Sequence, residues 1–334
     1  MYHGTDSLIR ARGTRRNAVR FGCLLAVTAL CAGSANRAAA QAAAPVAAVP
    51  PAAGAAAAAG GGDTQVGANL NISPKRVTFD RTTRSATVFI FNQGTGSATF
   101  DIALVDRVML PDGQIMPAAE AETKPEFKPE IDRLKSAQGM ITLTPRRAVL
   151  APGKGQTIRI RVAPGADATG EYRSHLTVTT IPPRDVGLTA EQAAAGAPGQ
   201  LRFIVNSVFG LSIPLIVRLS TPDVHAAIQN AKLEYADVST NGVAAPKRTP
   251  VVTFDLVRQG ANSLFGNVEV RSNKSRGGDP LGVARGVGVY TEIDHRSLRI
   301  PLTRAPAAGE QLEITFSDDD TAPGTVLARG PVGS

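Results

Sequence analysis

The stretch LRFIVNSVFGLSIPLIVR, residues 201–218, decides the fold class of this chain. Every second residue from Leu201 onward is apolar, apart from Ser207, whereas the other register contains Arg202 and Pro214. This alternation is typical of a β-strand with one apolar face, and the polar register excludes a membrane-spanning segment. Such a face needs a cover, which is either the protein's own core or a partner.

Short alternating segments separated by turn residues lie on both sides of this stretch. Turn sequences such as NQG at 92–94 and PDG at 111–113 separate them. The strand-like segments of the first block are RVTFD, SATVFIFNQG, ATFDIALVDRVML, MITLTP, QTIRIRVAP, YRSHLTVTTIPP and residues 201–218 itself. Those that follow from Ser220 onward are AKLEYADV, TPVVTFDLVRQG, GNVEVRSN, GVGVYTEI, SLRIPLT and QLEITFS. The charged stretch EIDRLKSAQ is expected to form one helical turn or a loop.

This spacing of strands and turns predicts an all-β protein. Residues 69–219 are expected to form an antiparallel β-sandwich, and residues 220–329 a smaller β-sandwich domain. Almost no linker separates the two blocks, so we expect a fixed angle between them and a cleft at the joint.

The N-terminus has the features of an exported protein. Residues 1–40 contain an arginine-rich start, the apolar run FGCLLAVTALCAGSA and small residues before Gln41, which predict a signal peptide cleaved after Ala40. The apolar run is shorter than the roughly 20 residues of a spanning helix. Leu30 before Cys31 argues against a lipoprotein. Residues 41–68, rich in Ala, Pro and Gly, are predicted to be a disordered linker.

Composition excludes several classes of function. Both cysteines, Cys23 and Cys31, lie in the predicted signal peptide, so the exported chain has no disulfide, thiol chemistry or cysteine-ligated metal. Removal of the signal peptide lowers the net charge from +8 to +3, which removes the main argument for a nucleic-acid partner.

No catalytic constellation is found in the sequence. His175, His225 and His295 are not part of an HExxH pair, and there is no GxSxG elbow. The segment PGKGQT at 152–157 precedes a strand and is expected to be a turn. The segment DDD at 318–320 lacks the ligand spacing of a calcium loop and is expected to be a solvated hairpin tip. We therefore expect no enzyme, no cofactor and no metal.

Several of these segments resemble one known family. The pieces SPKRVTF, ATVFIFNQG, LAPGKGQTIRI, GEYRSHLTVTTIPP and FGLSIPLIVR follow, in order and spacing over about 145 residues, the first domain of the PapD-like periplasmic pilus-assembly chaperones. The second domain is similar through VRQGANSLFGNVEV and the IPL at 300–302. The resemblance implies two immunoglobulin-like β-sandwich domains set at an angle, and a periplasmic location.

The resemblance also implies a function. Such chaperones lend their seventh strand to a subunit whose immunoglobulin-like fold lacks its last strand, without ATP. The implied partners are pilus or fimbrial subunits, or spore-coat-like subunits; whether an outer-membrane usher takes part stays open. Neither a nucleic acid nor a small-molecule substrate is implied.

Two arginines are the implied anchor for the carboxylate at the subunit's C-terminus. Arg76 matches the first-strand arginine of the family, but the expected lysine falls on Pro214. Arg173 on the sixth strand is expected to replace that lysine, as in the divergent branch of these chaperones. A charge-assisted hydrogen bond to a chain end would fix the register of binding.

The lent strand is expected to run from Phe203 to Ile213, with Pro214–Arg218 as the turn into the second domain. A bulge at Gly210 would reverse its phase. The residues implied as the donated face are Phe203, Val205, Ser207, Phe209 and Leu211.

The connection RDVGLTAEQAAAGAPGQ at 184–200 is long and flexible in composition, and it lacks the cysteine pair usual in long-loop members. This places the chain nearer the divergent branch. The alternative is a secreted structural or adhesive β-sandwich protein, whose apolar face at 201–213 would be buried in its own core. A carbohydrate-binding β-domain would need an exposed aromatic platform, for which a chain without Trp is poorly suited.

Overall fold

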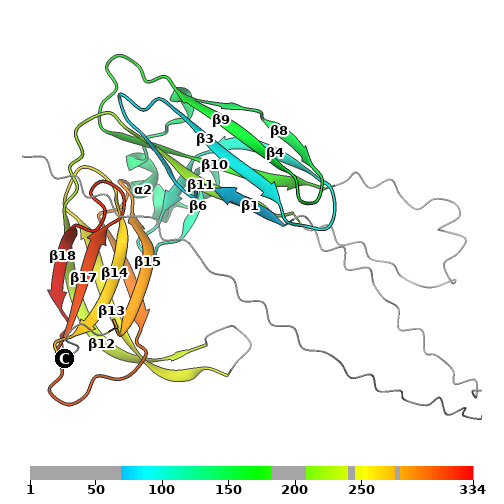
Figure 1. The fold of residues 1–334 in the computed structure, drawn as a ribbon. Helices are drawn as coiled ribbons and strands as arrows, with labels where there is room; N and C mark the ends of the chain where they lie inside the picture. Colours follow the sequence, from blue (N-terminus) through cyan, green and yellow to red (C-terminus); the bar gives the residue numbers. More distant parts are fainter. Residues whose placement is uncertain (1–68, 183–207, 240–244, 275–278, 334) are drawn as a thin grey trace, which may run out of the picture. The chain divides into compact units, whose positions relative to one another are not determined.

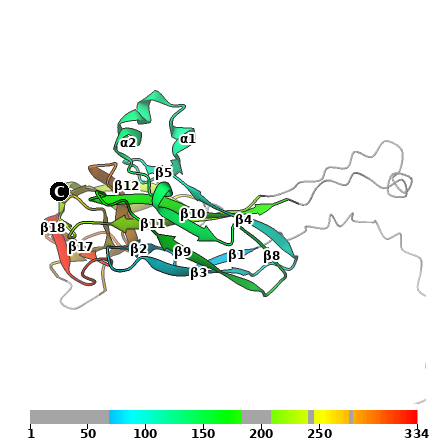
Figure 2. The same ribbon diagram turned by 90° about the horizontal axis from the view of Figure 1, so that it is seen from above.

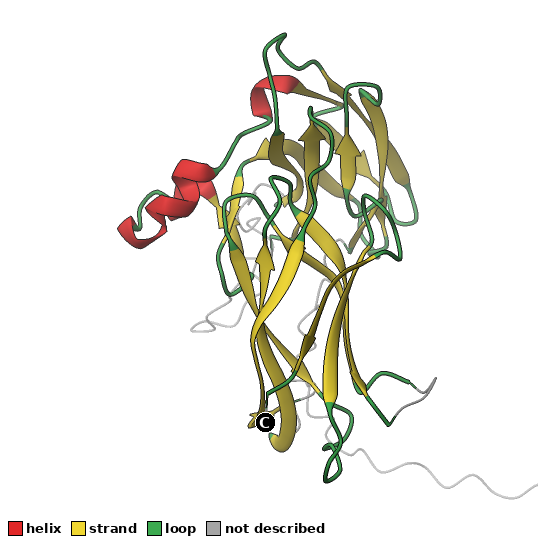
Figure 3. Ribbon diagram, turned by 90° about the vertical axis from the view of Figure 1, so that its left-hand side faces the viewer, coloured by secondary structure: helices red, strands yellow, loops and turns green. Residues whose placement is uncertain are grey.

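The computed structural model describes residues 69–182, 208–239, 245–274 and 279–333, all within one compact unit that spans residues 62–334. Regular structure in these ranges is almost entirely β-strand, with short helical segments gathered in one region (Figure 3). The prediction of an all-β protein is confirmed. The predicted signal peptide, the linker and the connection at 184–200 lie outside the described residues.

The first block forms two facing sheets (Figure 1). One has the strand order β1-β3-β9-β7, formed by Leu70–Ser73, Ser85–Asn92, Gly155–Val162 and Ile141–Thr144. The other has the order β2-β11-β10-β4-β8, formed by Val77–Phe79, Gly210–Arg218, Glu171–Ile181, Ala98–Val105 and Arg147–Leu150. All neighbours are antiparallel except β2 and β11, which run parallel.

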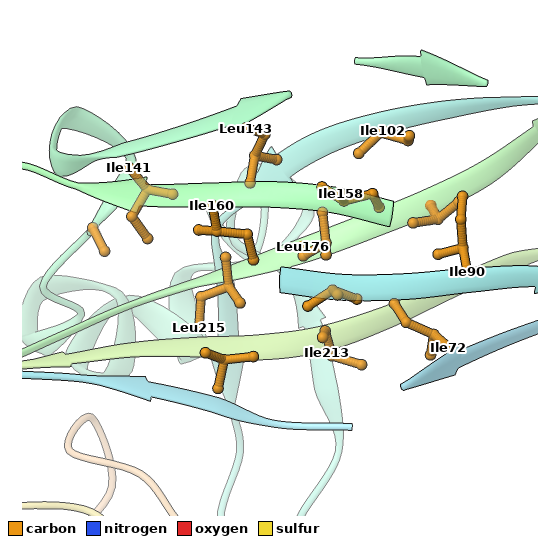
Figure 4. Close-up of a cluster of buried hydrophobic side chains, with 14 of the residues drawn as sticks. Ile72, Ile90, Ile102, Ile141, Leu143, Ile158, Ile160, Leu176, Ile213 and Leu215 are labelled. Atoms are coloured by element: carbon orange, nitrogen blue, oxygen red, sulfur yellow. The ribbon is translucent and has the colours of Figure 1, made fainter. Parts of the chain in front are cut away.

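The space between these sheets is filled by branched aliphatic side chains. Figure 4 shows Ile90, Ile158 and Ile160 of the first sheet against Leu176 and Leu215 of the second. Each of these five side chains is fully buried. Because successive residues of a strand point to opposite faces, the alternating pattern read from the sequence places one register here and the other outside.

The second block also forms two sheets around one core. The strand orders are β12-β13-β16, formed by Ala226–Val238, Lys247–Arg258 and His295–Pro301, and β15-β14-β17-β18, formed by Gly282–Val289, Leu264–Ser272, Leu312–Asp318 and Val326–Pro331. Val252 and Phe254 of β13 pack with Val268 of β14 and Phe316 of β17 in this core. Ile216 of β11 belongs to the same cluster.

Only part of the segment that follows β4 was predicted: its first strand lies within the predicted strand ATFDIALVDRVML, and its second helix overlaps EIDRLKSAQ, which was expected to form one helical turn or a loop. The segment contains the hairpin β5 (Arg107–Met109) and β6 (Ile115–Pro117), then α1 (Ala118–Ala121), a 3-10 turn at Pro125–Phe127, α2 (Lys128–Arg133) and a 3-10 turn at Gln138–Met140. Figure 2 shows α1 and α2 beside β5. Met109 packs into the second core, and Arg133 pairs with Asp294 at 2.8 Å.

Most predicted strands are present with shifted ends. The predicted strand ATFDIALVDRVML is two strands, β4 and β5, separated at Asp106. The strands β1 and β8 were not predicted. The stretch Pro214–Arg218, predicted as a turn, is the continuation of β11, so that prediction is wrong. Its residues Leu215 and Val217 contribute to the first core and Ile216 to the second, which keeps the strand extended.

Candidate functional site

The strand β11 has one edge that is only partly paired. Along its whole length, from Gly210 to Arg218, it pairs with β10. On the other side β2 pairs only with Leu215–Val217. The preceding part of β11 therefore has no strand partner on this side among the described residues, and we call Gly210–Pro214 the free edge.

Backbone groups of the free edge point away from β10 at alternate residues. The N–H of Thr180 donates to the carbonyl of Phe209 at 2.8 Å, and at the far end Leu219 donates to Gly170, also at 2.8 Å. Hydrogen-bonded pairs alternate in an antiparallel ladder, so Gly210 and Ser212 turn their N–H and C=O groups outward. Pro214 has no N–H to present, so the free edge offers its N–H donors before that residue.

The exposed side chains beside the free edge are apolar. Val208 is 58% exposed, Phe209 48% and Leu211 36%, whereas Ile213 is 3% exposed and belongs to the first core. The two described residues of the predicted face, Phe209 and Leu211, are thus exposed, and the next residue on that side of the strand, Ile213, is buried. Phe203, Val205 and Ser207, also predicted to be donated, lie outside the described residues.

The phase of β11 is regular where it is described. Its pairing with β10 runs from Thr179 opposite Gly210 to Glu171 opposite Arg218 without a register shift. A bulge at Gly210 is therefore not part of this pairing. Phe209, Leu211 and Ile213 lie on the same face of the strand.

Arg76 lies where the free edge ends. Val77 of β2 is opposite Leu215, so one residue further back Arg76 is opposite Pro214. Its Nη2 donates to Asp320 at 3.0 Å, and its guanidinium lies 4.5 Å from the ring centre of Phe265. The buried Nε and Nη1 of Arg76 have no hydrogen-bond partner among the described residues.

Arg173, the other predicted anchor, is already paired. Its Nη1 and Nη2 donate to Glu292 at 3.1 and 2.5 Å, and Nη2 also donates to the carbonyl of Arg107 at 2.6 Å. The ring of Tyr290 lies 3.7 Å from its guanidinium carbon. Arg173 is 3% exposed, and a direct anchor role would require Glu292 to release it.

A second buried ion-pair network was not predicted. Arg218 donates from Nε to Glu171 at 2.8 Å and pairs through Nη2 with Asp320, also at 2.8 Å. Burial would raise the pKa of Glu171, but the charge of Arg218 with hydrogen bonds from Ser263, Arg218 and Asn262 outweighs it, so the pKa is lowered. Asp320 therefore bridges Arg218 and Arg76.

The segment Asp318–Asp320 was expected to be a solvated hairpin tip; it does begin the turn between β17 and β18, but two of its three side chains are not solvated. Asp318 is 2% exposed and accepts backbone hydrogen bonds from Asp320, Thr321 and Ala322. The side chain of Asp320 is 13% exposed because it faces two arginines. Burial would raise the pKa of Asp320, but the charges of these arginines outweigh it and lower the pKa. The acidic run DDD in the sequence does not indicate that Asp320 pairs with Arg76 and Arg218.

His175 lies among the arginines. It is 2% exposed, and neither Nδ1 nor Nε2 has a hydrogen-bond partner among the described residues. Burial, followed by the charges of Arg173, Arg107 and Arg76, lowers its pKa to about 2. The imidazole is therefore neutral at pH 7, and the two predicted anchors both lie near it.

Within the described part of the chain, no group of three or more His, Cys, Asp or Glu side chains could hold a metal ion. None of the helices in these ranges is long and apolar enough to span a membrane.

The fold and site together define a two-core, all-β protein with a basic cluster at the end of a free strand edge. No family model matches the chain, and no curated protein matches it.

Solved structures match the chain over most of its length. The YadV chaperone has 11% identity, with 79% of this chain and 99% of that chain covered and a TM-score of 0.39. The Escherichia coli chaperone DraB has 13% identity, 80% and 96% coverage and a TM-score of 0.39. A chain of the Salmonella enterica SafA pilin in complex with the SafB chaperone has 13% identity, 79% and 94% coverage and a TM-score of 0.36. These similarities to solved chaperone structures are at 11–13% sequence identity.

Proposed function

We propose that this protein is a periplasmic, ATP-independent chaperone that caps pilus or fimbria-like subunits by adding β11 to their incomplete sandwich. The observation that carries the proposal is the free edge Gly210–Pro214 with the exposed side chains of Phe209 and Leu211 beside it. Strand addition uses backbone hydrogen bonds for affinity and alternate side chains for specificity, and this segment offers both.

The residues at the end of the free edge support a binding site there for the C-terminus of the subunit. A strand added parallel to β11 would run toward Pro214 and end beside Arg76, which directly precedes β2, the strand already paired there. Arg76 has two guanidinium nitrogens without partners in the described chain, and a terminal carboxylate accepts such donors in charge-assisted hydrogen bonds. In this proposal Arg76 is the direct anchor. Arg173 is paired with Glu292, so in this proposal it does not contact the carboxylate directly.

A structural or adhesive β-sandwich protein is the second candidate. It requires the apolar face of β11 to be covered by the protein's own core. Phe209 is 48% exposed and Leu211 is 36% exposed, so the core does not cover them. Neighbouring apolar side chains that stay exposed to water mark an interaction surface, which favours the chaperone.

Co-expression tests the proposal. The protein is produced in a periplasm together with small secreted β-proteins encoded beside its gene, and complexes are isolated and identified by mass spectrometry. We expect a 1:1 complex that is lost with Phe209→Asp and kept with Val149→Asp, a matched change at an apolar side chain of β8 that is 71% exposed. A free monomer in the presence of such subunits, or equal loss with both variants, contradicts the proposal.

A further inference from the structure

His175 is a buried polar group that the fold leaves unsatisfied. Both ring nitrogens lack a hydrogen-bond partner in the described chain, although the side chain is 2% exposed. A buried donor without a partner is costly, and most such groups in proteins are paired with a protein group, a water or a ligand. The groups around His175 determine which kind of ligand could bind its ring nitrogens.

The strand register places His175 next to the end of the free edge. On β10 it is directly opposite Pro214 of β11. Its neighbour Leu176 points into the first core, so His175 points to the opposite face of the sheet. Arg76 lies opposite Pro214 on the other side, and Pro214 therefore lies between His175 and Arg76 in one row across three strands.

The charged groups around His175 favour an anion. Arg173 on its own strand, Arg107 on β5 and Arg76 before β2 are all close enough to act on its ionisation. Tyr290 contacts the imidazole edge to face, with ring centres 6.4 Å apart. In the described part of the chain, two acidic groups contact these arginines, and both are already engaged. Glu292 accepts hydrogen bonds from Arg173 and from the N–H of Met109 at 2.7 Å, and Asp320 pairs with Arg76 at 3.0 Å through Nη2 alone.

Several donors of this cluster are unused. The buried Nε atoms of Arg76, Arg107 and Arg173, together with Nη1 of Arg76, have no partner in the described ranges. A carboxylate is acceptor-only, with about four lone-pair sites, so it can satisfy several such donors at once. A neutral imidazole supplies one N–H for this purpose without adding another charge to the arginines.

We propose that His175 is a ligand-binding residue of this chaperone: its ring N–H, together with Arg76, binds the terminal carboxylate of the chain that pairs with the free edge. This inference rests on the proposed function. It assigns to His175 the second contact with the carboxylate, since the expected lysine is replaced by Pro214. Because a hydrogen bond to a charged group is lost, removal of the ring N–H should raise the dissociation constant for the carboxylate roughly ten- to hundredfold.

Acetate is the first probe, because it tests the anion site without strand pairing. Ring nitrogen-15 NMR of the purified protein is recorded while sodium acetate replaces sodium chloride at constant ionic strength. The His175 signals, assigned by their loss in His175→Gln, are expected to shift saturably. His225 and His295 serve as internal controls within the same spectra. A His175 signal that does not respond to acetate overturns the inference.

Two peptides connect the site to the strand. They share an alternating valine–threonine sequence and end in a free carboxylate or in an amide. We expect the free acid to bind more tightly to the wild-type protein, and His175→Phe, which keeps an aromatic ring against Tyr290, to remove that preference. His175→Gln, which keeps a donor, should restore part of it.

The outcomes separate the two proposals. Equal binding of acid and amide to the wild-type protein, with shifts at the amides of Gly210 and Ser212, overturns the role of His175 and leaves strand addition standing. An acetate response at His175 without any peptide effect on those amides supports the anion site and contradicts strand addition. If His175→Phe fails to fold, the acetate titration of the wild-type protein decides.

Discussion

Arg173 of β10 and Glu292, which follows β15, form a buried two-point ion pair, with Nη1–Oε2 at 3.1 Å and Nη2–Oε1 at 2.5 Å. Glu292 also accepts the backbone N–H of Met109 at 2.7 Å. One carboxylate thus holds together a strand of the first sandwich, the β5 hairpin and a loop of the second block.

The first prediction concerns this carboxylate. Glu292→Ala leaves a buried guanidinium and a buried N–H without their acceptor, and we expect it to lower the free energy of unfolding by about 3–5 kcal/mol. The control is Asp294→Ala, which removes an exposed carboxylate paired with Arg133 at 2.8 Å and, more loosely, with Arg258 at 3.7 Å, and should cost about 1 kcal/mol or less. Urea unfolding followed by circular dichroism measures both. Equal losses of unfolding free energy in the two variants would contradict the role of Glu292 as a buried acceptor that stabilises the fold.

The second prediction is a pH dependence carried by Glu171 and Asp320. The folded protein lowers both pKa values from their ordinary values of 4.5 and 3.8. A carboxyl group with a lowered folded pKa contributes stability above its unfolded pKa, and this contribution is lost as the pH falls through the folded value. We therefore expect unfolding free energy to fall steeply below about pH 4.5.

Glu171→Gln tests the origin of this acid sensitivity. The variant should be less stable than the wild-type protein at pH 7, and the difference should shrink as the pH is lowered below about 4.5. Glu313→Gln is the control, since its pair with Arg329 is exposed and 3.7 Å long. A difference that stays constant down to pH 3 would place the acid sensitivity elsewhere.

The sequence predicted what depends on local pattern. Period-two alternation identified β3, β9, β10 and β11, because one face of each strand is buried. It missed β1 and β8, each four residues long, which are too short for a period to be recognised. The helix α2 overlaps EIDRLKSAQ, which was expected to form one helical turn or a loop, but it begins two residues earlier, where Pro129 and a Lys128–Asp132 pair stabilise its start.

Long-range pairing was beyond the reach of the sequence. Arg76 and Arg173 were expected as anchors through the resemblance to a known family. Their partners Asp320 and Glu292 are more than 100 residues away in the chain, and nothing local marks them. A lone histidine within a strand, such as His175, gives no sign of the arginines around it.

The third prediction tests the free edge with proline. In β11 the N–H of Ser212 points outward and that of Leu211 points to β10, so only Leu211→Pro removes a ladder hydrogen bond. We expect Ser212→Pro to remain folded and to lose subunit binding, and Leu211→Pro to unfold at clearly lower denaturant concentration. Thermal unfolding and co-purification measure the two effects. If Ser212→Pro destabilises as much as Leu211→Pro, the outer side of β11 is already in use.

The fourth prediction divides the apolar face of β11 into a part for the partner and a part for the fold. Phe209 is 48% exposed and Ile213 is 3% exposed, although both lie on the same face. Phe209→Asp should change the unfolding free energy by about 0.5 kcal/mol or less, because it places a charge in contact with water. Ile213→Asp places an unpaired carboxylate in the first core and should prevent stable folding. Ile213→Val, which costs about 0.5–1.5 kcal/mol, controls for loss of volume alone. Unfolding of Phe209→Asp to the extent of Ile213→Asp would mean that the side chain of Phe209 belongs to the protein's own core, as the structural alternative requires.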